Sequence, residues 1–148
     1  MRMLLTIPAL APLLAGCGNS DKYAENADVP ELATRSETPG DWSQLAQMVD
    51  RTPDESGLLQ NSPISVDLNA LLGPDAQRFR EAMAGAGPLT RRGDALVTVA
   101  PSRAAFLVIV PADHALAAGV KSGARWRTHR TPGADVQLPP DVAALAMS

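Results

Sequence analysis

Few side chains of this 148-residue chain could do chemistry. His114 follows Asp113 at an expected helix start, where a capping aspartate beside a histidine is a simpler interpretation than an acid–base pair. His129 lies between arginines, and no second histidine or cysteine stands at the spacing of a zinc site. No serine lies in a Gly-x-Ser-x-Gly elbow. We therefore predict that the protein is not an enzyme and has neither a metal site nor a cofactor.

The single cysteine ends an apolar run. Arg2 supplies a positive charge, residues 4–15 are apolar, and Leu14-Ala15-Gly16-Cys17 closes the run. The run is shorter than the roughly 20 residues that a membrane-spanning helix needs. This segment resembles the lipobox of bacterial lipoproteins, and the resemblance implies a diacylglycerol on the Cys17 sulfur and cleavage after Gly16. An ordinary signal peptide with an incidental cysteine, or a buried N-terminal strand, are the alternatives.

Residues 18–40 lack apolar periodicity and are rich in acidic and small polar residues, which predicts a flexible acidic tether (17–40) before one small domain (41–148). The resemblance to lipoproteins makes residues 1–16 a signal peptide. It places the protein in the bacterial cell envelope, held on the membrane by lipid on Cys17 and facing the periplasm. By analogy with the sorting of enterobacterial lipoproteins, in which an aspartate after the cysteine favours the inner membrane, the resemblance implies that Gly18 favours the outer membrane. Residues 18–60 hold nine acids against three bases, and the chain has a net charge of -3. This acidity argues against a nucleic-acid partner.

Helical patterns follow the tether. Asp41 is a good N-cap for a short helix whose apolar side begins with Trp42 and Leu45. This helix either packs on the flank of the domain or binds a partner with Trp42 as an anchor. A second helix is predicted to begin at Pro63, with Ser62 as its N-cap, and to end at Gly73. A third follows Gly73-Pro74, with Phe79 and Met83 on its inward face, and the two are predicted to form a pair joined by a corner.

The C-terminal half is rich in strand patterns. The predicted strands cover 89–92, 95–100, 104–110 and 124–131, with a two-residue turn at Gly93-Asp94. The run 104–110 is uniformly apolar, which is typical of a central strand buried on both faces. Residues 114–118 are predicted to form a short helix closed by Gly119, and 141–147 a terminal helical turn. We predict an α+β fold with the helical pair packed on an antiparallel sheet of three to five strands.

Alternation along 124–131 predicts a basic strand face. Trp126, Thr128 and Arg130 fall on one side of this strand, and the other side carries Arg125, Arg127 and His129. This second face either is merely solvated or meets an anionic partner, whether a glycan polymer, an acidic protein or the tether of the same chain.

The order of two helices followed by strands is similar to that of the bacterial inhibitors of vertebrate-type lysozyme. The likeness covers about residues 62–140 and includes Leu71-Leu72-Gly73, Phe79, Met83, Gly87-Pro88-Leu89 and the strand around Phe106. The resemblance implies a loop between two strands that carries a histidine between paired cysteines and enters the lysozyme cleft. The matching residues here, Ala100-Pro101-Ser102-Arg103, hold neither residue type, so the family's functional residues do not carry over.

These observations predict a lipid-anchored, non-enzymatic binding or structural module of the cell envelope, whose partner is an envelope protein or a glycan. The alternative is a periplasmic inhibitor of a lysozyme-like cell-wall lytic enzyme.

Overall fold

The computed structural model describes residues 40–148. The predicted signal peptide (1–16), Cys17 and the predicted tether up to residue 39 lie outside the described residues. Within residues 40–148, no helix is long and apolar enough to cross a membrane.

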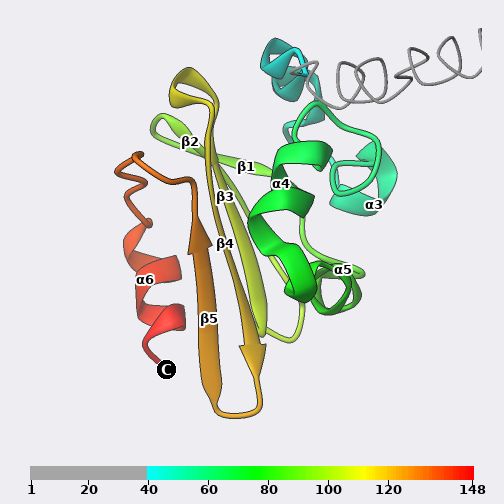
Figure 1. The fold of residues 1–148 in the computed structure, drawn as a ribbon. Helices are drawn as coiled ribbons and strands as arrows, with labels where there is room; N and C mark the ends of the chain where they lie inside the picture. The colour runs from blue at the N-terminus through cyan, green and yellow to red at the C-terminus, as the bar shows by residue number, and fades with distance from the viewer. Residues whose placement is uncertain (1–39) are drawn as a thin grey trace, which may run out of the picture. The chain divides into compact units, whose positions relative to one another are not determined.

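A five-stranded antiparallel sheet organises the described part of the chain (Figure 1). Each strand pairs with its neighbours in the sequence, so the spatial order is β1-β2-β3-β4-β5. The strands are β1 (Thr90–Arg92), β2 (Ala95–Val99), β3 (Ala105–Val110), β4 (Ala115–Ser122) and β5 (Arg125–Arg130). The meander leaves β1 and β5 at the two edges.

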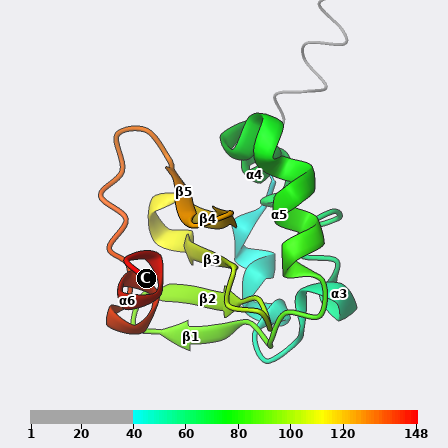
Figure 2. The ribbon, with the colours of Figure 1, turned by 90° about the horizontal axis from the view of Figure 1, so that it is seen from below.

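The helical elements surround this sheet on both faces (Figures 1 and 2). They are η1 (Trp42–Met48), α3 (Pro53–Ser56), α4 (Ser65–Leu72), η2 (Gly73–Asp75), α5 (Ala76–Met83), η3 (Pro111–Asp113) and α6 (Pro140–Ala146). Figure 2 shows α4 and α5 on one face and α6 on the other. The predicted α+β class, with a helical pair on an antiparallel sheet, is confirmed.

The predictions of a buried central strand and of a hairpin at Gly93-Asp94 are also confirmed. β3 lies at the centre of the sheet and is buried along residues 105–109, as its uniformly apolar sequence predicts. The β1–β2 hairpin turns at Gly93-Asp94, where Gly93 has a φ of 63°. A positive φ at the first turn residue is what a type II′ turn requires, and glycine adopts it without steric cost.

The helical pair forms, but the predicted N-cap of its first helix is wrong: α4 begins at Ser65, and its N-cap is Ile64, which makes no side-chain capping hydrogen bond. Ser62 Oγ accepts a hydrogen bond of 3.3 Å from the Ile64 backbone N–H just before α4. Gly73 then turns the chain with a φ of 52°, and Pro74 opens the single turn that leads into α5. Phe79 and Met83 of α5 are fully buried, which confirms the predicted inward face of this helix.

The predicted helix after Asp41 is a 3-10 helix. The Asp41 side chain accepts a hydrogen bond of 3.1 Å from the Ser43 backbone N–H, so its role as N-cap is confirmed. Trp42 is only 4% exposed and packs in the main hydrophobic core with Leu45. The interpretation of Trp42 as an anchor for a partner is therefore wrong, because its surface is already covered by the domain.

One predicted element is wrong. Residues 114–118 do not form a helix closed by Gly119 but belong mostly to β4, which lies between β3 and β5. His114 adopts a left-handed conformation, with a φ of 48°, and this turns the chain from η3 into the strand. Tertiary pairing overrides the helix propensity of the Ala-Leu-Ala-Ala run here, because a central strand buries that run on both faces.

Candidate functional site

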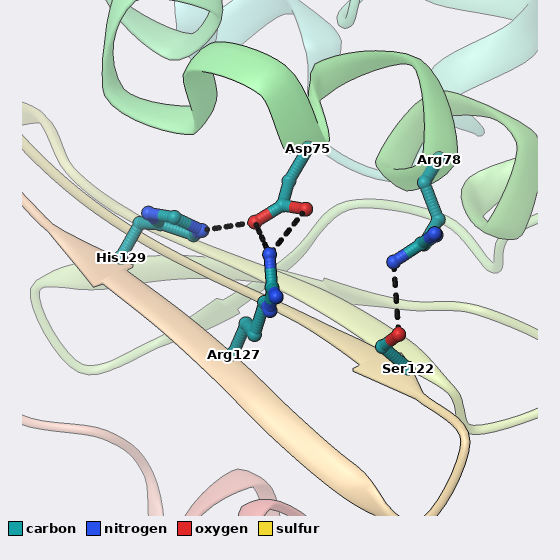
Figure 3. Close-up of polar contacts among 5 residues, drawn as sticks. All are labelled: Asp75, Arg78, Ser122, Arg127 and His129. Carbon is teal, nitrogen blue, oxygen red and sulfur yellow. Dashed lines mark hydrogen bonds and ion pairs between the residues drawn. The ribbon is translucent and has the colours of Figure 1, made fainter.

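The clearest polar cluster of the described residues joins the helical pair to β5. Asp75 lies at the corner between α4 and α5, with its side chain only 8% exposed. Its carboxylate accepts hydrogen bonds from Arg127 Nη1 at 3.2 and 3.4 Å, and His129 Nε2 lies 3.1 Å from Oδ2 (Figure 3). We name Asp75, Arg127 and His129 the polar clasp.

The clasp changes the proton affinity of its carboxyl group. Burial by itself raises the pKa of Asp75, because it disfavours the charged form. The hydrogen bonds with His129 and Arg127, together with the charges of these two side chains, outweigh burial and lower the pKa below its usual value of 3.8. Asp75 is therefore an anion under ordinary conditions, and the guanidinium of Arg127 from β5 carries the opposite charge beside it.

A second polar link lies on the same side of the sheet. Arg78 Nη1 of α5 donates a hydrogen bond of 2.9 Å to Ser122 Oγ at the end of β4 (Figure 3). Among residues 40–148, no serine, threonine or cysteine side chain hydrogen-bonds to His129, so the Asp75–His129 pair has no nucleophile to activate. What the arrangement does is hold the helical pair against β4 and β5.

The three residues of the predicted basic face have different surroundings in the structure. Arg127 and His129 both contact Asp75, whereas Arg125 at the start of β5 is exposed. The Arg127 side chain remains 59% exposed despite its ion pair, and that of His129 is 27% exposed. Solvent thus reaches all three side chains, although two of them already serve the packing of the domain.

Asp113 and His114 do not form an acid–base pair. Within the described part of the chain no hydrogen bond joins them, and Asp113 belongs to η3 while His114 is the left-handed residue that follows. The imidazole stacks on Trp42 instead, with ring centroids 4.9 Å apart and planes at 28°. His114 therefore packs against η1 and has a structural role.

The β2–β3 connection is a tight turn. The Ala100 backbone N–H donates to the Ala105 carbonyl, and the Arg103 N–H donates back to the Ala100 carbonyl, both at 2.9 Å. Arg103 takes a left-handed conformation with a φ of 58°. Residues 100–103 thus join two sheet strands, as expected, and the turn holds neither a cysteine nor a histidine.

A hollow of about 630 Å³ lies away from the basic face. It is bounded by the β1–β2 turn, the end of β3 and the segment that leads into α6. None of Arg125, Arg127 and His129 lines it. Within residues 40–148, no group of three or more histidine, cysteine, aspartate or glutamate side chains is placed to hold a metal ion.

Fold and site together define a small α+β domain whose polar contacts join the helical pair to β4 and β5. The family model for the inhibitor of vertebrate lysozyme matches residues 63–148. The match includes α4, α5, all five strands and α6, which is more than half of the chain, and the protein belongs to this family. No curated protein and no solved structure matches the chain.

The family match confirms the resemblance seen in the two helices and the strands that follow. It agrees with the prediction of a non-enzymatic protein, since the family is one of inhibitors. What the sequence did not indicate is Asp75, which lies 52 and 54 positions before its two partners. The Gly73-Pro74 corner placed Asp75 at a helix junction, but no local pattern links that junction to β5.

Proposed function

We propose that this chain is a non-enzymatic, lipid-anchored protein of the bacterial envelope that binds a lysozyme-like cell-wall lytic enzyme in the periplasm. The observation that carries the proposal is the family match, which spans the whole sheet and the helices on both of its faces. Binding of this kind needs a stable folded surface and no catalytic group. The clasp of Asp75, Arg127 and His129 supports such a surface by fixing the helices on β5.

The β2–β3 turn affects where on the surface we place the contact with the lytic enzyme. Residues 100–103 form a closed turn without the histidine and cysteines that the family resemblance implied, so this turn does not act as a plug for an active-site cleft. We place the contact instead on the basic face of β5, with Arg125 as its exposed member outside the clasp and with contributions from Arg127 and His129.

The direct test measures lysis of peptidoglycan by a vertebrate lysozyme and by a bacterial lytic enzyme, with and without purified residues 18–148. We expect lysis by at least one of the two enzymes to slow as the protein is added, and no release of glycan fragments by the protein alone. Unchanged lysis by both enzymes at concentrations well above theirs would contradict the proposal.

The contact on β5 is tested with an exposed arginine outside the clasp. Arg125→Ser leaves the contacts of Asp75 intact and should weaken binding of the lytic enzyme, more at low salt than at moderate salt, because exposed charges are screened. Arg51→Ser, which removes the same charge from a residue far from β5 in the sequence, is the matched control. Equal effects of the two substitutions would assign the arginine to ordinary solvated surface.

The membrane anchor is the remaining part of the proposal. Leu14-Ala15-Gly16-Cys17 supports a mature protein that begins with an acylated Cys17, and Gly18 supports the outer membrane as its destination. Two or three acyl chains hold a protein firmly, because each buried CH₂ contributes about 0.8 kcal/mol. Cys17→Ser should leave an unprocessed precursor or release the protein from the membrane fraction. A wild-type protein that carries no lipid by mass spectrometry would contradict this anchor.

A further inference from the structure

We propose that the free edge of β5 is a docking site for an extended acidic segment of a partner protein, which adds to the sheet as a sixth strand. This inference goes beyond the proposed function, because it does not require that the partner be a lytic enzyme. It rests on the topology of the sheet, on the hydrogen-bond register of β5 and on the charge of this strand.

The two edges of the sheet differ in what covers them. β1 has only three residues, and the chain beside it is already engaged, since Leu89 exchanges backbone hydrogen bonds with Asp50 and Arg51 at 2.8 and 2.9 Å. β5 has six residues and pairs with β4 alone (Figure 2). Among residues 40–148, therefore, β5 presents the longer and less covered edge.

The register decides which backbone groups of β5 point outward. The Thr131 N–H donates to the Leu116 carbonyl at 2.9 Å, and these two residues lie directly opposite each other. Pairs that exchange hydrogen bonds alternate with pairs that do not along an antiparallel ladder. The residues of β5 that bond to β4 are then 125, 127 and 129. The backbone N–H and C=O groups of Trp126, Thr128 and Arg130 point away from β4, toward the free edge.

The other side of β4 agrees with this alternation. The Lys121 N–H donates to the Ala104 carbonyl at 2.7 Å, so the odd-numbered residues of β4 bond to β3 and the even-numbered ones to β5. Three N–H donors and three C=O acceptors are thus available to an added strand, which is the arrangement that β-augmentation uses.

The charge of β5 selects the kind of strand that fits. Three of its six residues are arginines and a fourth is His129, while the one acidic side chain bonded to this strand is Asp75. Arg125 and Arg130 are exposed and form no ion pair within the described residues. Opposite charges stabilise cross-strand pairs, and like charges directly opposite destabilise them. A second copy of β5 would set arginines against arginines, whereas an acidic strand would pair with them.

The probe for this site is a synthetic peptide of about six alternating glutamate and threonine residues, the length of an ordinary strand. Its binding to residues 18–148 is measured by fluorescence anisotropy. The control peptide has the same sequence with alternate backbone nitrogens methylated, which keeps the charge and removes donors. We expect the first peptide to bind at least about tenfold more tightly, since the control loses several backbone hydrogen bonds. Equal binding of the two would mean that only charge attracts them and would overturn the proposal.

The matching variants act on one outward-facing residue. Thr128→Pro removes an N–H that points to the free edge and leaves the hydrogen bonds to β4 in place, because proline is tolerated on an edge strand in this orientation. Thr128→Ala keeps the N–H and is the matched control. We expect Thr128→Pro to weaken peptide binding by about tenfold and Thr128→Ala to leave it unchanged. Equal affinities of the two variants would overturn the proposal.

If Thr128→Pro does not fold, amide hydrogen exchange of the protein without substitutions provides a second test of the proposal. The peptide should slow exchange at Trp126, Thr128 and Arg130 and leave α4 and α5 unchanged. Absence of such protection would show that the arginines of β5 merely guard the edge against other strands, as charged residues on edges often do. Protection of the same amides by dimerisation without peptide would assign the edge to a second copy of this chain, which also overturns the proposal.

Discussion

The two faces of the sheet are built from different side chains. The face under α4 and α5, the helix-pair face, presents long aliphatic residues from the strands: Leu96, Leu107, Ile109, Leu116 and Val120. They pack on buried residues of the two helices: Leu68, Leu72, Ala76, Phe79 and Met83. The other face, the α6 face, presents mostly small residues, with one buried aromatic ring: Ala95, Val97, Phe106, Val108, Ala115 and Ala117.

The helices that cover these faces differ in the same way. The helix-pair face is also joined to its helices by the clasp at Asp75 and by the hydrogen bond from Arg78 to Ser122. On the α6 face, Val142 is the one buried hydrophobic residue of the covering helix. The ion pair that links α6 to β1, between Arg92 and Asp141, is 3.5 Å long and half exposed on both sides. The comparison teaches that one face carries most of the cohesion of the domain and that the other depends on few side chains.

The largest expected effect is the loss of stability on shortening Phe106, which tests whether the α6 face depends on few buried side chains. Its ring is fully buried on the α6 face and contacts Trp126, with ring centroids 5.6 Å apart. Phe106→Ala should lower the free energy of unfolding by about 3–5 kcal/mol, measured by urea denaturation. Ile109→Ala, on the helix-pair face of the same strand, should cost about 2–5 kcal/mol. Losses below about 0.5 kcal/mol at both positions would contradict the central role of β3.

The sequence predicted the elements whose signals are local. The uniformly apolar run of β3, the Gly93-Asp94 turn and the Gly73-Pro74 corner each specify a conformation through residues close together in the chain. β4 was mistaken for a helix because its alanines and Leu116 favour helix locally. What makes it a strand is the pairing with β3 and β5, which no window of neighbouring residues contains.

The candidate site was predicted in part for the same reason. Alternation along β5 correctly separated Arg125, Arg127 and His129 from Trp126, because a strand has a period of two. The partner of the two clasp residues, Asp75, comes from a distant helix corner. Without Asp75, the sequence could not show that two of the three side chains of this face already contact a carboxylate of the same domain.

A smaller effect is expected at Gly119, the residue of β4 that lies opposite Phe106. A Cβ atom built on Gly119 would clash with the Phe106 ring, with the Cζ atom only 2.6 Å away. Gly119→Ala should therefore cost about 1–3 kcal/mol, because overpacking forces the ring or the backbone to move. Calorimetric unfolding measures this loss.

The control for this prediction is Gly87→Ala, since a Cβ atom there has no neighbour within 4 Å. Combining Gly119→Ala with Phe106→Leu should cost less than the sum of the two single changes, because the smaller side chain leaves room for the methyl group. Strictly additive losses of stability would show that the close approach of the Phe106 ring to Gly119 does not determine how the α6 face packs.

The clasp predicts an acid-dependent effect confined to the helix-pair face. A carboxyl group whose pKa is lowered in the folded state stabilises the fold above the unfolded pKa and loses this contribution as the pH falls through the folded pKa. For Asp75 the loss begins near 3.8 and continues below it. Asp75→Asn should therefore flatten the acid side of the stability–pH profile, measured as denaturant midpoints between about pH 6 and pH 2.5.

Asp67→Asn is the charge-matched control for Asp75, because it removes an exposed carboxylate from the first turn of α4. This variant should keep the acid dependence of the wild type. If both variants flatten the profile equally, the acid dependence reflects overall charge rather than the clasp.

The smallest expected effect concerns the opening of α6 without unfolding of the rest. This helix has seven residues, buries Val142 and contributes Leu145 and Ala146 only as partly buried side chains. Segments with few buried apolar contacts open locally at a lower free energy than the core. Amides of α6 should therefore exchange at least about tenfold faster than those of β3, whereas amides in the second half of α5 should exchange at rates closer to the core. Val142→Ala should speed exchange in α6 further and leave α5 unchanged, because the two helices lie on opposite faces (Figure 2). Exchange of α6 as slow as that of β3 would mean that the α6 face is as firmly held as the other, and the contrast between the faces would fail.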